Sequence, residues 1–177
     1  MAMGSPRDAE RAAVYAVEDQ WGQVLDRGGD LDFFGSRLHL SRQRVFSDLA
    51  EVQRYVDALL TKYWERTREP DIPEPVQVRL RRGVTRAHYE RSPTPAIAIP
   101  LDAHWACREV VILHEVAHHL SYAGPSGSLL HDARFRSLLV YLADLALGPE
   151  SAFVLRTGYQ GAGLSVSDLD VGRQVAR

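Results

Sequence analysis

The chain has 177 residues, 45% of them hydrophobic and 25% charged, a balance typical of one globular domain with a sizeable core. Its 21 basic and 23 acidic residues give a formal net charge of −2, which excludes a global attraction to nucleic acid or anionic lipid. A single cysteine, Cys107, excludes an internal disulfide and any metal site built from several cysteines.

The first element predicted along the chain is a helix. The residues before it lack the apolar run of a signal peptide, and no stretch reaches the roughly 20 apolar residues that cross a bilayer. We therefore expect a cytoplasmic protein with no membrane partner. Apolar residues such as Val14, Val17 and Trp21 recur at three- and four-residue steps and predict a helix over 6–28, ended by Gly28-Gly29.

A second helix is predicted to begin at Ser47, as its N-cap, and to end near Thr67. The segment between the two helices, residues 30–44, is ambiguous. One interpretation is a short turn of helix around Phe33 and Phe34.

Three prolines within residues 69–75 require extended chain and separate the helical front from a different kind of structure. Beyond them, apolar and polar residues alternate over 76–81, which predicts a strand, and Gly83 allows a turn into a hairpin partner over 84–90. A third short strand, AIAI, is predicted over 96–99.

Three more helices follow. The first is predicted from Asp102, as N-cap, to the stop at Gly124-Pro125, the second from near Asp132 to Leu147, and the third from there through Arg156. Residues 160–177 show little apolar periodicity and are predicted to form a flexible tail.

The helix predicted after Asp102 carries the motif His114-Glu115-x-x-His118. Residues four apart lie one turn above each other, so the two imidazoles share a face at a separation that one zinc ion can bridge. Glu115 is offset by about 100° and is placed to act on a water rather than to bind the ion. The rest of the helix is apolar nearly all round, so these polar groups are expected to be buried and to need a compensating cation.

Zinc needs a third protein ligand and one open position. His131, at the start of the next helix, is the favoured candidate, because the chain reverses direction between it and His118. Asp144 and Glu150 remain alternatives, contributed by a later helix. The pattern predicts one zinc ion per chain.

The run His114-Glu115-x-x-His118, followed by a loop and His131-x-x-x-Phe135, resembles the SprT-like zinc metallopeptidases, whose third ligand lies in a His-Gly-x-x-Phe element. It is most similar to a small bacterial group of metallohydrolases within that set, over about residues 76–159. In two respects it departs: Asp132 replaces the glycine, and the zinc ribbon or DNA-binding extension of several SprT-like proteins does not follow.

The resemblance implies the same chemistry as the spacing. Zinc lowers the pKa of its water and polarises the scissile carbonyl, while Glu115 serves as general base and later protonates the leaving amine. Asp132 either orients a ligand histidine or caps the helix from 133, and both roles are compatible. For stabilising the oxyanion, Tyr159 is favoured because a tyrosine after the last helix can fold back over the site. Packing or exposure is the alternative for it and for the other candidates, Arg156, Tyr122 and His104.

Three further features carry weaker interpretations. His119 points about 100° away from His118 and is predicted to be a core residue or to support a ligand. The strand over 96–99 is predicted as an edge that aligns an extended peptide by main-chain pairing. Five arginines within 78–91 are able to contact phosphates, although a solvated hairpin face is the favoured reading.

These patterns together predict an α+β, zincin-like fold with N-terminal helices, a small and mostly antiparallel three-stranded sheet, and two ligand-bearing helices. We expect one domain in three parts: a helical segment over 1–68, a catalytic core over 69–159 and the tail over 160–177. The predicted function is a zinc metallopeptidase acting on a peptide or protein substrate. The alternatives are a zinc protein that does not cleave peptides, whether a regulatory protein or a hydrolase of another amide, and a DNA-associated SprT-like factor with nucleic acid as partner.

Overall fold

The computed structural model describes residues 8–67, 73–83, 86–123, 127–128 and 130–169. In chain order, the elements are α1 (Arg11–Arg27), β1 (Gly29–Phe33), β2 (Ser36–Leu40), α2 (Leu49–Thr67), β3 (Gln77–Leu80), β4 (His88–Glu90), β5 (Ala96–Ile99), a short 3-10 helix η1 (His104–Cys107), α3 (Glu109–Ala123), α4 (Ala133–Leu147) and α5 (Pro149–Gly161). The predicted α+β class is confirmed.

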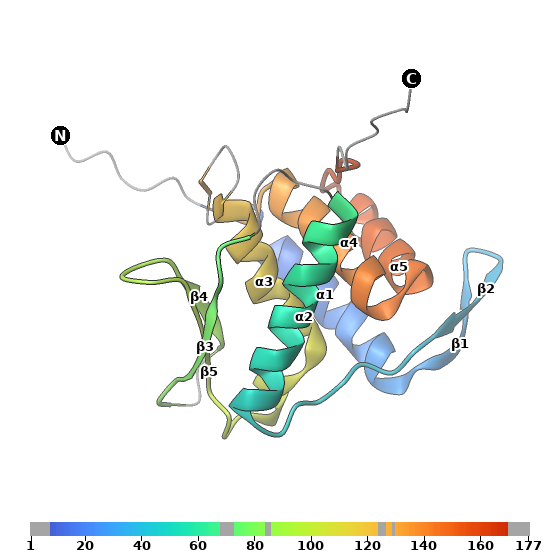
Figure 1. The fold of residues 1–177 in the computed structure, drawn as a ribbon. Helices are drawn as coiled ribbons and strands as arrows, with labels where there is room; N and C mark the ends of the chain where they lie inside the picture. Colours follow the sequence, from blue (N-terminus) through green and yellow to red (C-terminus); the bar gives the residue numbers. More distant parts are fainter. Residues whose placement is uncertain (1–7, 68–72, 84–85, 124–126, 129, 170–177) are drawn as a thin grey trace.

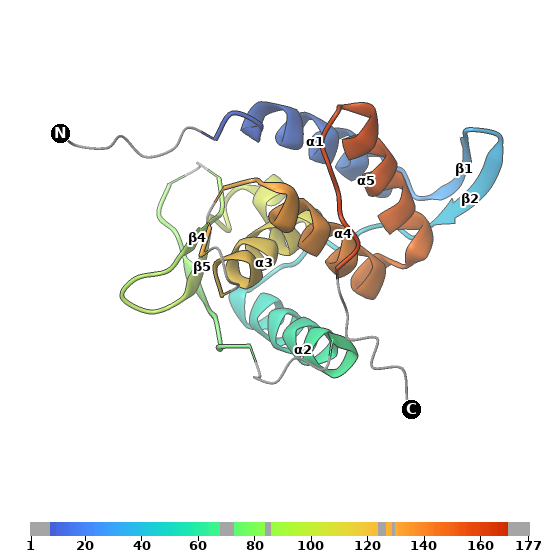
Figure 2. The ribbon, with the colours of Figure 1, turned by 90° about the horizontal axis from the view of Figure 1, so that it is seen from above.

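The helix α3 lies at the centre of the fold, between the three-stranded sheet on one side and α4 on the other (Figures 1 and 2). Helix α4 also packs against α5 and α2, and α1 packs against α5. Buried apolar side chains from these helices and from the sheet form one hydrophobic cluster. Helix α3, which carries His114 and His118, is therefore packed between the sheet and α4.

The ambiguous segment after α1 is a β-hairpin and not a turn of helix. Strands β1 and β2 pair antiparallel, with Phe33 opposite Ser36, and the hairpin projects from the helices (Figure 1). Phe34 and Gly35 form the two-residue turn with φ of 48° and 80°. Positive φ at both turn positions matches the right-handed twist of the strands, which explains why a glycine follows the phenylalanine.

Helix α2 ends at Thr67 as predicted, but its cap lies one residue later than predicted. The carboxylate of Asp48 accepts a hydrogen bond from the backbone N–H of Glu51 at 2.7 Å, and the Glu51 carboxylate accepts one from the backbone N–H of Ser47 at 3.0 Å. The first bond makes Asp48, and not Ser47, the N-cap, and the second satisfies the N–H of the residue before the cap.

The sheet has the order β3-β5-β4, which contradicts the predicted hairpin between the segments 76–81 and 84–90. Strand β3 pairs parallel with β5, and β4 pairs antiparallel with β5, so the sheet is mixed rather than mostly antiparallel. The predicted edge strand over 96–99 is the central strand, buried at all four positions. A strand buried on both faces reads as a continuous apolar run, as AIAI does, instead of alternating.

Helix α3 begins at Glu109, seven residues after the predicted cap at Asp102. The chain around residue 108 is instead tied to the segment before α2: Phe46 N–H donates to the carbonyl of Cys107 at 2.9 Å, and Glu109 N–H donates to that of Arg44 at 2.9 Å. These bonds hold an extended backbone, so the helix cannot start earlier. Helix α4 begins and ends as predicted.

Residues 162–169, predicted to belong to a flexible tail, are anchored on the helices. Leu164 is buried, and the backbone N–H of Ser167 donates to the hydroxyl of Ser137 at 2.9 Å. The first two residues of the predicted tail belong to α5. The rest of the prediction, over 170–177, lies outside the described residues.

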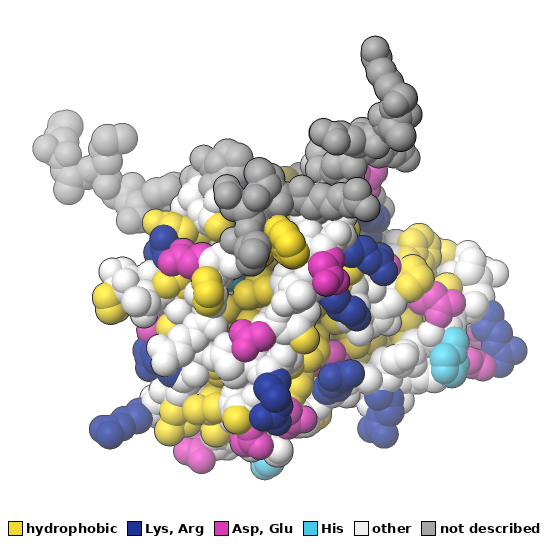
Figure 3. Space-filling view, in the orientation of Figure 1, with side chains coloured by type: hydrophobic (Ala, Val, Ile, Leu, Met, Phe, Trp, Pro, Cys, Tyr) yellow, Lys and Arg dark blue, Asp and Glu magenta, His cyan; other side chains and the backbone are white. Residues whose placement is uncertain are grey.

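On the face seen in Figure 3, basic and acidic side chains lie interspersed among apolar ones, in keeping with the small net charge. None of the helices in the described part of the chain combines the length and the apolar character needed to cross a bilayer.

Candidate metal centre

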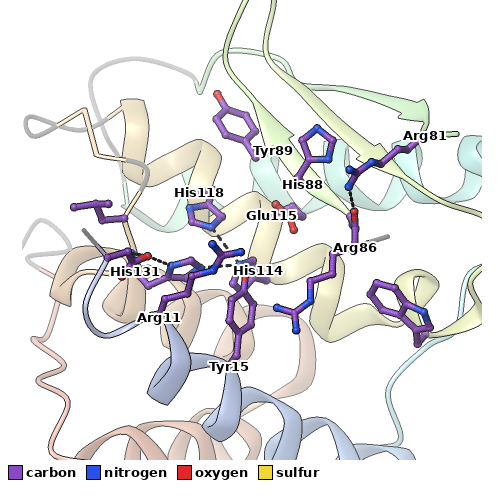
Figure 4. A pocket seen from close by; sticks show the side chains of 14 residues that line it. Arg11, Tyr15, Arg81, Arg86, His88, Tyr89, His114, Glu115, His118 and His131 are labelled. Carbon is purple, nitrogen blue, oxygen red and sulfur yellow. Dashed lines mark hydrogen bonds and ion pairs between the residues drawn. The ribbon is translucent and has the colours of Figure 1, made fainter. Parts of the chain in front are cut away.

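Three buried histidines converge at one point, as predicted (Figure 4). His114 and His118 lie one turn apart on α3, and their Nε2 atoms are 3.1 Å apart. His131 lies just before α4, and its Nε2 atom is 3.2 Å from that of His114. The chain reversal after α3 therefore brings the third imidazole to the first two, and the group could hold a metal ion.

The two alternative third ligands lie elsewhere. Glu150 accepts a hydrogen bond from the backbone N–H of His39 in β2 at 3.0 Å. Asp144 lines a separate cavity between α4 and α5. Neither belongs to the histidine group.

The hydrogen bonds of the rings explain why their Nε2 atoms face one another. His114 donates from Nδ1 to the carboxylate of Glu18 at 2.7 Å, and His131 donates from Nδ1 to the carboxylate of Asp8. In a neutral ring held this way, Nε2 carries a lone pair and no proton. Two bare nitrogens repel each other, and a cation between them removes that repulsion.

The spacing of the nitrogens also fits a metal. A tetrahedral zinc ion with Zn–N bonds of 2.0–2.1 Å requires about 3.3 Å between neighbouring ligand nitrogens. The separations of 3.1 and 3.2 Å are close to that value. Three neutral imidazoles are moreover the donor set that zinc accepts in catalytic sites, where a fourth position stays open.

Burial favours the neutral form of each of the three rings, although it does not decide the pKa of all of them. Burial lowers the pKa of His118 well below its ordinary value, with help from the neighbouring His114 and His131, so this ring is neutral at pH 7. Burial also lowers the pKa of His131, against the opposing effect of Asp8. For His114, burial lowers the pKa, but the charge and hydrogen bond of Glu18 together with the charge of Glu115 raise it, and the net direction is upward. Metal binding at this centre therefore competes mainly with a proton on His114.

The Glu18 carboxylate is itself held by Tyr159, which corrects the role expected for that tyrosine. The Tyr159 hydroxyl donates to Glu18 Oε1 at 2.8 Å, and His114 bonds the other oxygen, Oε2. Burial raises its pKa well above the ordinary value, so the hydroxyl keeps its proton. Because α5 runs on to Gly161, Tyr159 lies within a helix and is fully buried, and it does not line the pocket where a substrate would sit.

The other candidates for the oxyanion also lie outside that pocket. The guanidinium of Arg156 pairs with Asp168 at 3.1 Å, and that of Arg91 lies 5.2 Å from the Tyr122 ring centroid. His104 is exposed on η1. None of the three lines the pocket that contains the histidines.

Asp132 caps α4, which confirms one of its two interpretations. Its carboxylate accepts from the backbone N–H of Phe135 at 3.0 Å. The carboxylate that orients His131 is instead Asp8, more than a hundred residues earlier.

Arg136 is a further support that the sequence does not reveal. Its side chain is 1% exposed, and Nη1 donates to the carbonyl of His131 at 2.6 Å and to the carboxylate of Glu10 at 2.5 Å. Its Nε donates to the carbonyl of Ser165 at 2.9 Å. One buried guanidinium thus ties the third histidine to the segments at both ends of the described chain.

Glu115 lies beside the histidines, in the same pocket of about 740 Å³. Burial raises its pKa, whereas His114, His88 and a hydrogen bond from the backbone of Tyr89 lower it. Its carboxylate is therefore close to the metal centre without belonging to the ligand group. The residues that line the pocket are Asp8, Arg11, Tyr15, Arg81, Arg86, Ala87, His88, Tyr89, Trp105, His114, Glu115, His118, Leu130 and His131.

His119 is a core residue, as predicted, and connects α3 to the sheet. It is 1% exposed, donates from Nε2 to the carbonyl of Glu74 at 2.7 Å, and lies with Nδ1 3.2 Å from the Tyr89 hydroxyl. Among the five arginines of residues 78–91, Arg79 pairs with Glu90 and Arg91 pairs with Glu74. Two of the others line the pocket, so the segment is not a uniform basic face.

No family model, no curated protein and no solved structure matches this chain.

Proposed function

We propose that this protein is a zinc-dependent metallohydrolase that cleaves peptide bonds. The observation that carries the proposal is the convergence of three imidazole Nε2 atoms in a pocket that also contains Glu115. His114, His118 and His131 are the proposed ligands of one zinc ion per chain. When bound, zinc lowers the pKa of a coordinated water toward 7 and polarises a carbonyl group.

Glu115 is the proposed general base. Its carboxylate is buried beside the histidines, and burial favours the neutral form, so the side chain accepts a proton readily and can return it to a leaving amine. Three histidines alone are sufficient to hold a zinc ion. A carboxylate in the same pocket, with no role as a ligand, therefore favours catalysis over a purely structural ion.

Strand β4 is the proposed docking site for an extended substrate. It is an edge of the sheet, and its residues His88 and Tyr89 line the pocket. An extended peptide that pairs with a strand edge gains main-chain hydrogen bonds with little dependence on sequence. This assigns to β4 the role that the sequence had suggested for residues 96–99.

The similarity of the motif to the SprT-like zinc metallopeptidases supports the same chemistry, as an expectation from sequence. A zinc protein without peptidase activity remains the rival. A DNA-associated factor has less support, because Arg79 and Arg91 already pair with carboxylates.

Metal analysis and hydrolysis of an unfolded protein such as casein test the proposal together. We expect native protein to hold one zinc per chain, the Glu115→Gln variant to keep the zinc but lose at least a hundredfold in activity, and His131→Ala to lose both. Matched controls on exposed positions are Glu65→Gln and His104→Ala.

Each outcome decides a different step. Full activity in Glu115→Gln would overturn the base, and retention of tightly bound zinc by His131→Ala would overturn the ligand set. A native protein that holds zinc but cleaves no peptide would be the non-peptidase rival.

A further inference from the structure

The pocket that contains the three histidines is also lined by three arginines from different parts of the chain. Arg11 is the first residue of α1, Arg81 follows β3, and Arg86 precedes β4. Figure 4 shows Arg11 beside His114 and His131, and Arg86 on the other side of Tyr15. Cationic side chains therefore flank the metal centre on more than one side.

In the described chain, these three arginines have no acidic partner. Among the described residues, no carboxylate lies within ion-pair distance of the three. Elsewhere in that part of the chain, seven arginines each pair with a carboxylate: Arg37, Arg44, Arg79, Arg91, Arg108, Arg136 and Arg156. Guanidinium groups that have no carboxylate partner at a pocket are suited to bind carboxylates and phosphates in bidentate fashion.

Tyr15 fixes the distance between the arginines and the metal centre. Its ring stacks on His114, with centroids 5.3 Å apart and planes at 17°, and lies 5.1 Å from the His131 ring. The guanidinium carbons of Arg86 and Arg11 lie 4.5 and 5.4 Å from the same ring centroid. Each of these two arginines is thus held about one aromatic ring away from a metal ligand.

The charges of the occupied centre would leave an excess of positive charge. The two positive charges of a divalent ion would leave one of three nearby carboxylate charges, those of Asp8, Glu18 and Glu115, without a partner. One of the three arginines of the lining offsets that charge. The other two arginines have no negative charge to match them in the lining. A positively charged hollow beside a low-dielectric wall favours an anionic ligand.

We infer that the substrate carries a carboxylate within about one residue of the scissile bond, bound by Arg11 and Arg86, with Arg81 holding the Arg86 backbone through a hydrogen bond to its carbonyl. This inference rests on the proposed function, because it names the substrate class of that site. The carboxylate belongs either to an acidic side chain or to the C-terminus of a peptide.

A peptide carboxylate fits better than the phosphates of a nucleic acid. A polyanion needs a run of unpaired cations along its path. In the 78–91 segment, Arg79 is paired with Glu90 and Arg91 with Glu74. Other described arginines without an acidic partner lie outside the pocket, and the three that line it lie around the histidines. One localised negative charge is sufficient to match those three.

Calorimetric binding to the zinc-loaded Glu115→Gln protein tests this without turnover. Three acetylated probes are compared: Ala-Ala-Glu-Ala amide, Ala-Ala-Gln-Ala amide, and Ala-Ala-Ala-Ala with a free C-terminal carboxylate. We expect one or both carboxylate peptides to bind roughly tenfold or more tightly than the glutamine peptide, since hydrogen bonds to charged groups contribute that much. The tighter of the two identifies the source of the carboxylate.

Arginine variants locate the effect. Arg11→Gln and Arg86→Gln should abolish the preference, while Arg82→Gln, an exposed neighbour that does not line the pocket, should keep it. Equal binding of all three peptides, or a preference unchanged in both pocket variants, overturns the inference. Tighter binding of a 12-nucleotide single strand, lost in the same variants, overturns it in favour of nucleic acid.

Casein cleavage by the native protein separates this inference from the proposed function. Cleavage without any carboxylate preference rejects the inference alone. A carboxylate preference in a protein that cleaves no peptide rejects the proposed function and leaves the anion site in place.

Discussion

The two sides of the metal centre are built differently. On the support side, defined by Asp8, Glu18, Arg136 and Tyr159, side chains are largely withdrawn from solvent, and each hydrogen-bonds a ligand histidine or a group that holds one. On the open side, defined by Arg81, Arg86, His88 and Tyr89, side chains are half-buried or exposed and line the pocket. No side chain of the open side hydrogen-bonds a ligand histidine.

Because the two sides are built differently, we expect metal affinity and substrate binding to be set by different residues. Hydrogen bonds made inside a protein are strong, because few water molecules compete for the same groups. Charges at an exposed surface are screened and contribute little to the geometry of a neighbour. We therefore expect substitutions on the support side to change zinc affinity and those on the open side to change substrate binding.

Among substitutions on the two sides, Glu18→Gln is expected to have the largest effect on zinc affinity. The glutamine keeps the size of the side chain but removes its negative charge. That charge strengthens the hydrogen bond from His114 Nδ1 and raises the pKa of the His114 ring. Loss of such a carboxylate weakens metal binding by roughly 10–100-fold. Competition with a chelating dye measures the dissociation constant, with Glu65→Gln as the control. An unchanged constant would show that the support side does not control the metal.

Arg136→Gln comes next. The shorter side chain cannot reach the carbonyl of His131, Glu10 and Ser165 together, so His131 loses the contact that fixes its backbone. We expect a destabilisation of about 1–3 kcal/mol and roughly tenfold weaker zinc binding at a temperature where the variant is folded. Chemical denaturation and the same dye competition measure the two quantities. A destabilised variant with native zinc affinity would mean that Arg136 serves the fold alone.

The three histidines could be predicted from the sequence, and the residues that support them could not. His114, Glu115 and His118 lie within one turn of one helix, so their relation follows from helical geometry alone. His131 follows them closely, after a glycine-proline stop that signals a reversal of the chain. Local spacing was therefore sufficient to predict which three histidines converge.

The supporting residues could not be found that way. Asp8 lies just before α1 and Glu18 lies within it, about a hundred residues before the histidines that they hold, so only the tertiary fold brings them together. No local pattern distinguishes them from a neighbouring acidic residue such as Asp19. For the same reason the sequence suggested the wrong place for Tyr159. Where its side chain lies depends on how far α5 extends and on what α5 packs against.

The strand order failed for a related reason. Nearness in sequence favoured a hairpin between the segments around β3 and β4, but β5 pairs with both. The apolar run of β5 does signal burial on both faces. It does not say which strands cover its edges, and that choice depends on contacts across the whole sheet.

Tyr159→Phe tests the outermost part of the support side and should have a smaller effect. The variant removes one hydroxyl and keeps the ring, so the Glu18 carboxylate loses one of its two hydrogen bonds while still accepting from His114. A net hydrogen bond is worth about 1 kcal/mol, and part of this reaches the metal, so zinc affinity should fall two- to fivefold. A decrease in peptide cleavage of a hundredfold or more with zinc fully bound would instead return Tyr159 to a catalytic role.

Arg86→Gln is expected to have the smallest effect, and one of opposite sign. Its guanidinium lies over Tyr15, which stacks on His114, so the variant removes a positive charge near the metal without removing a hydrogen bond to any ligand. Because a cation near a cation is unfavourable, zinc should bind slightly more tightly, by less than about threefold given the exposure of the side chain. The same dye competition at low and high salt measures it, and the gain should disappear as salt screens the charge. Weaker zinc binding in this variant would show that the open side also holds the ligands, and that the two sides are not separable.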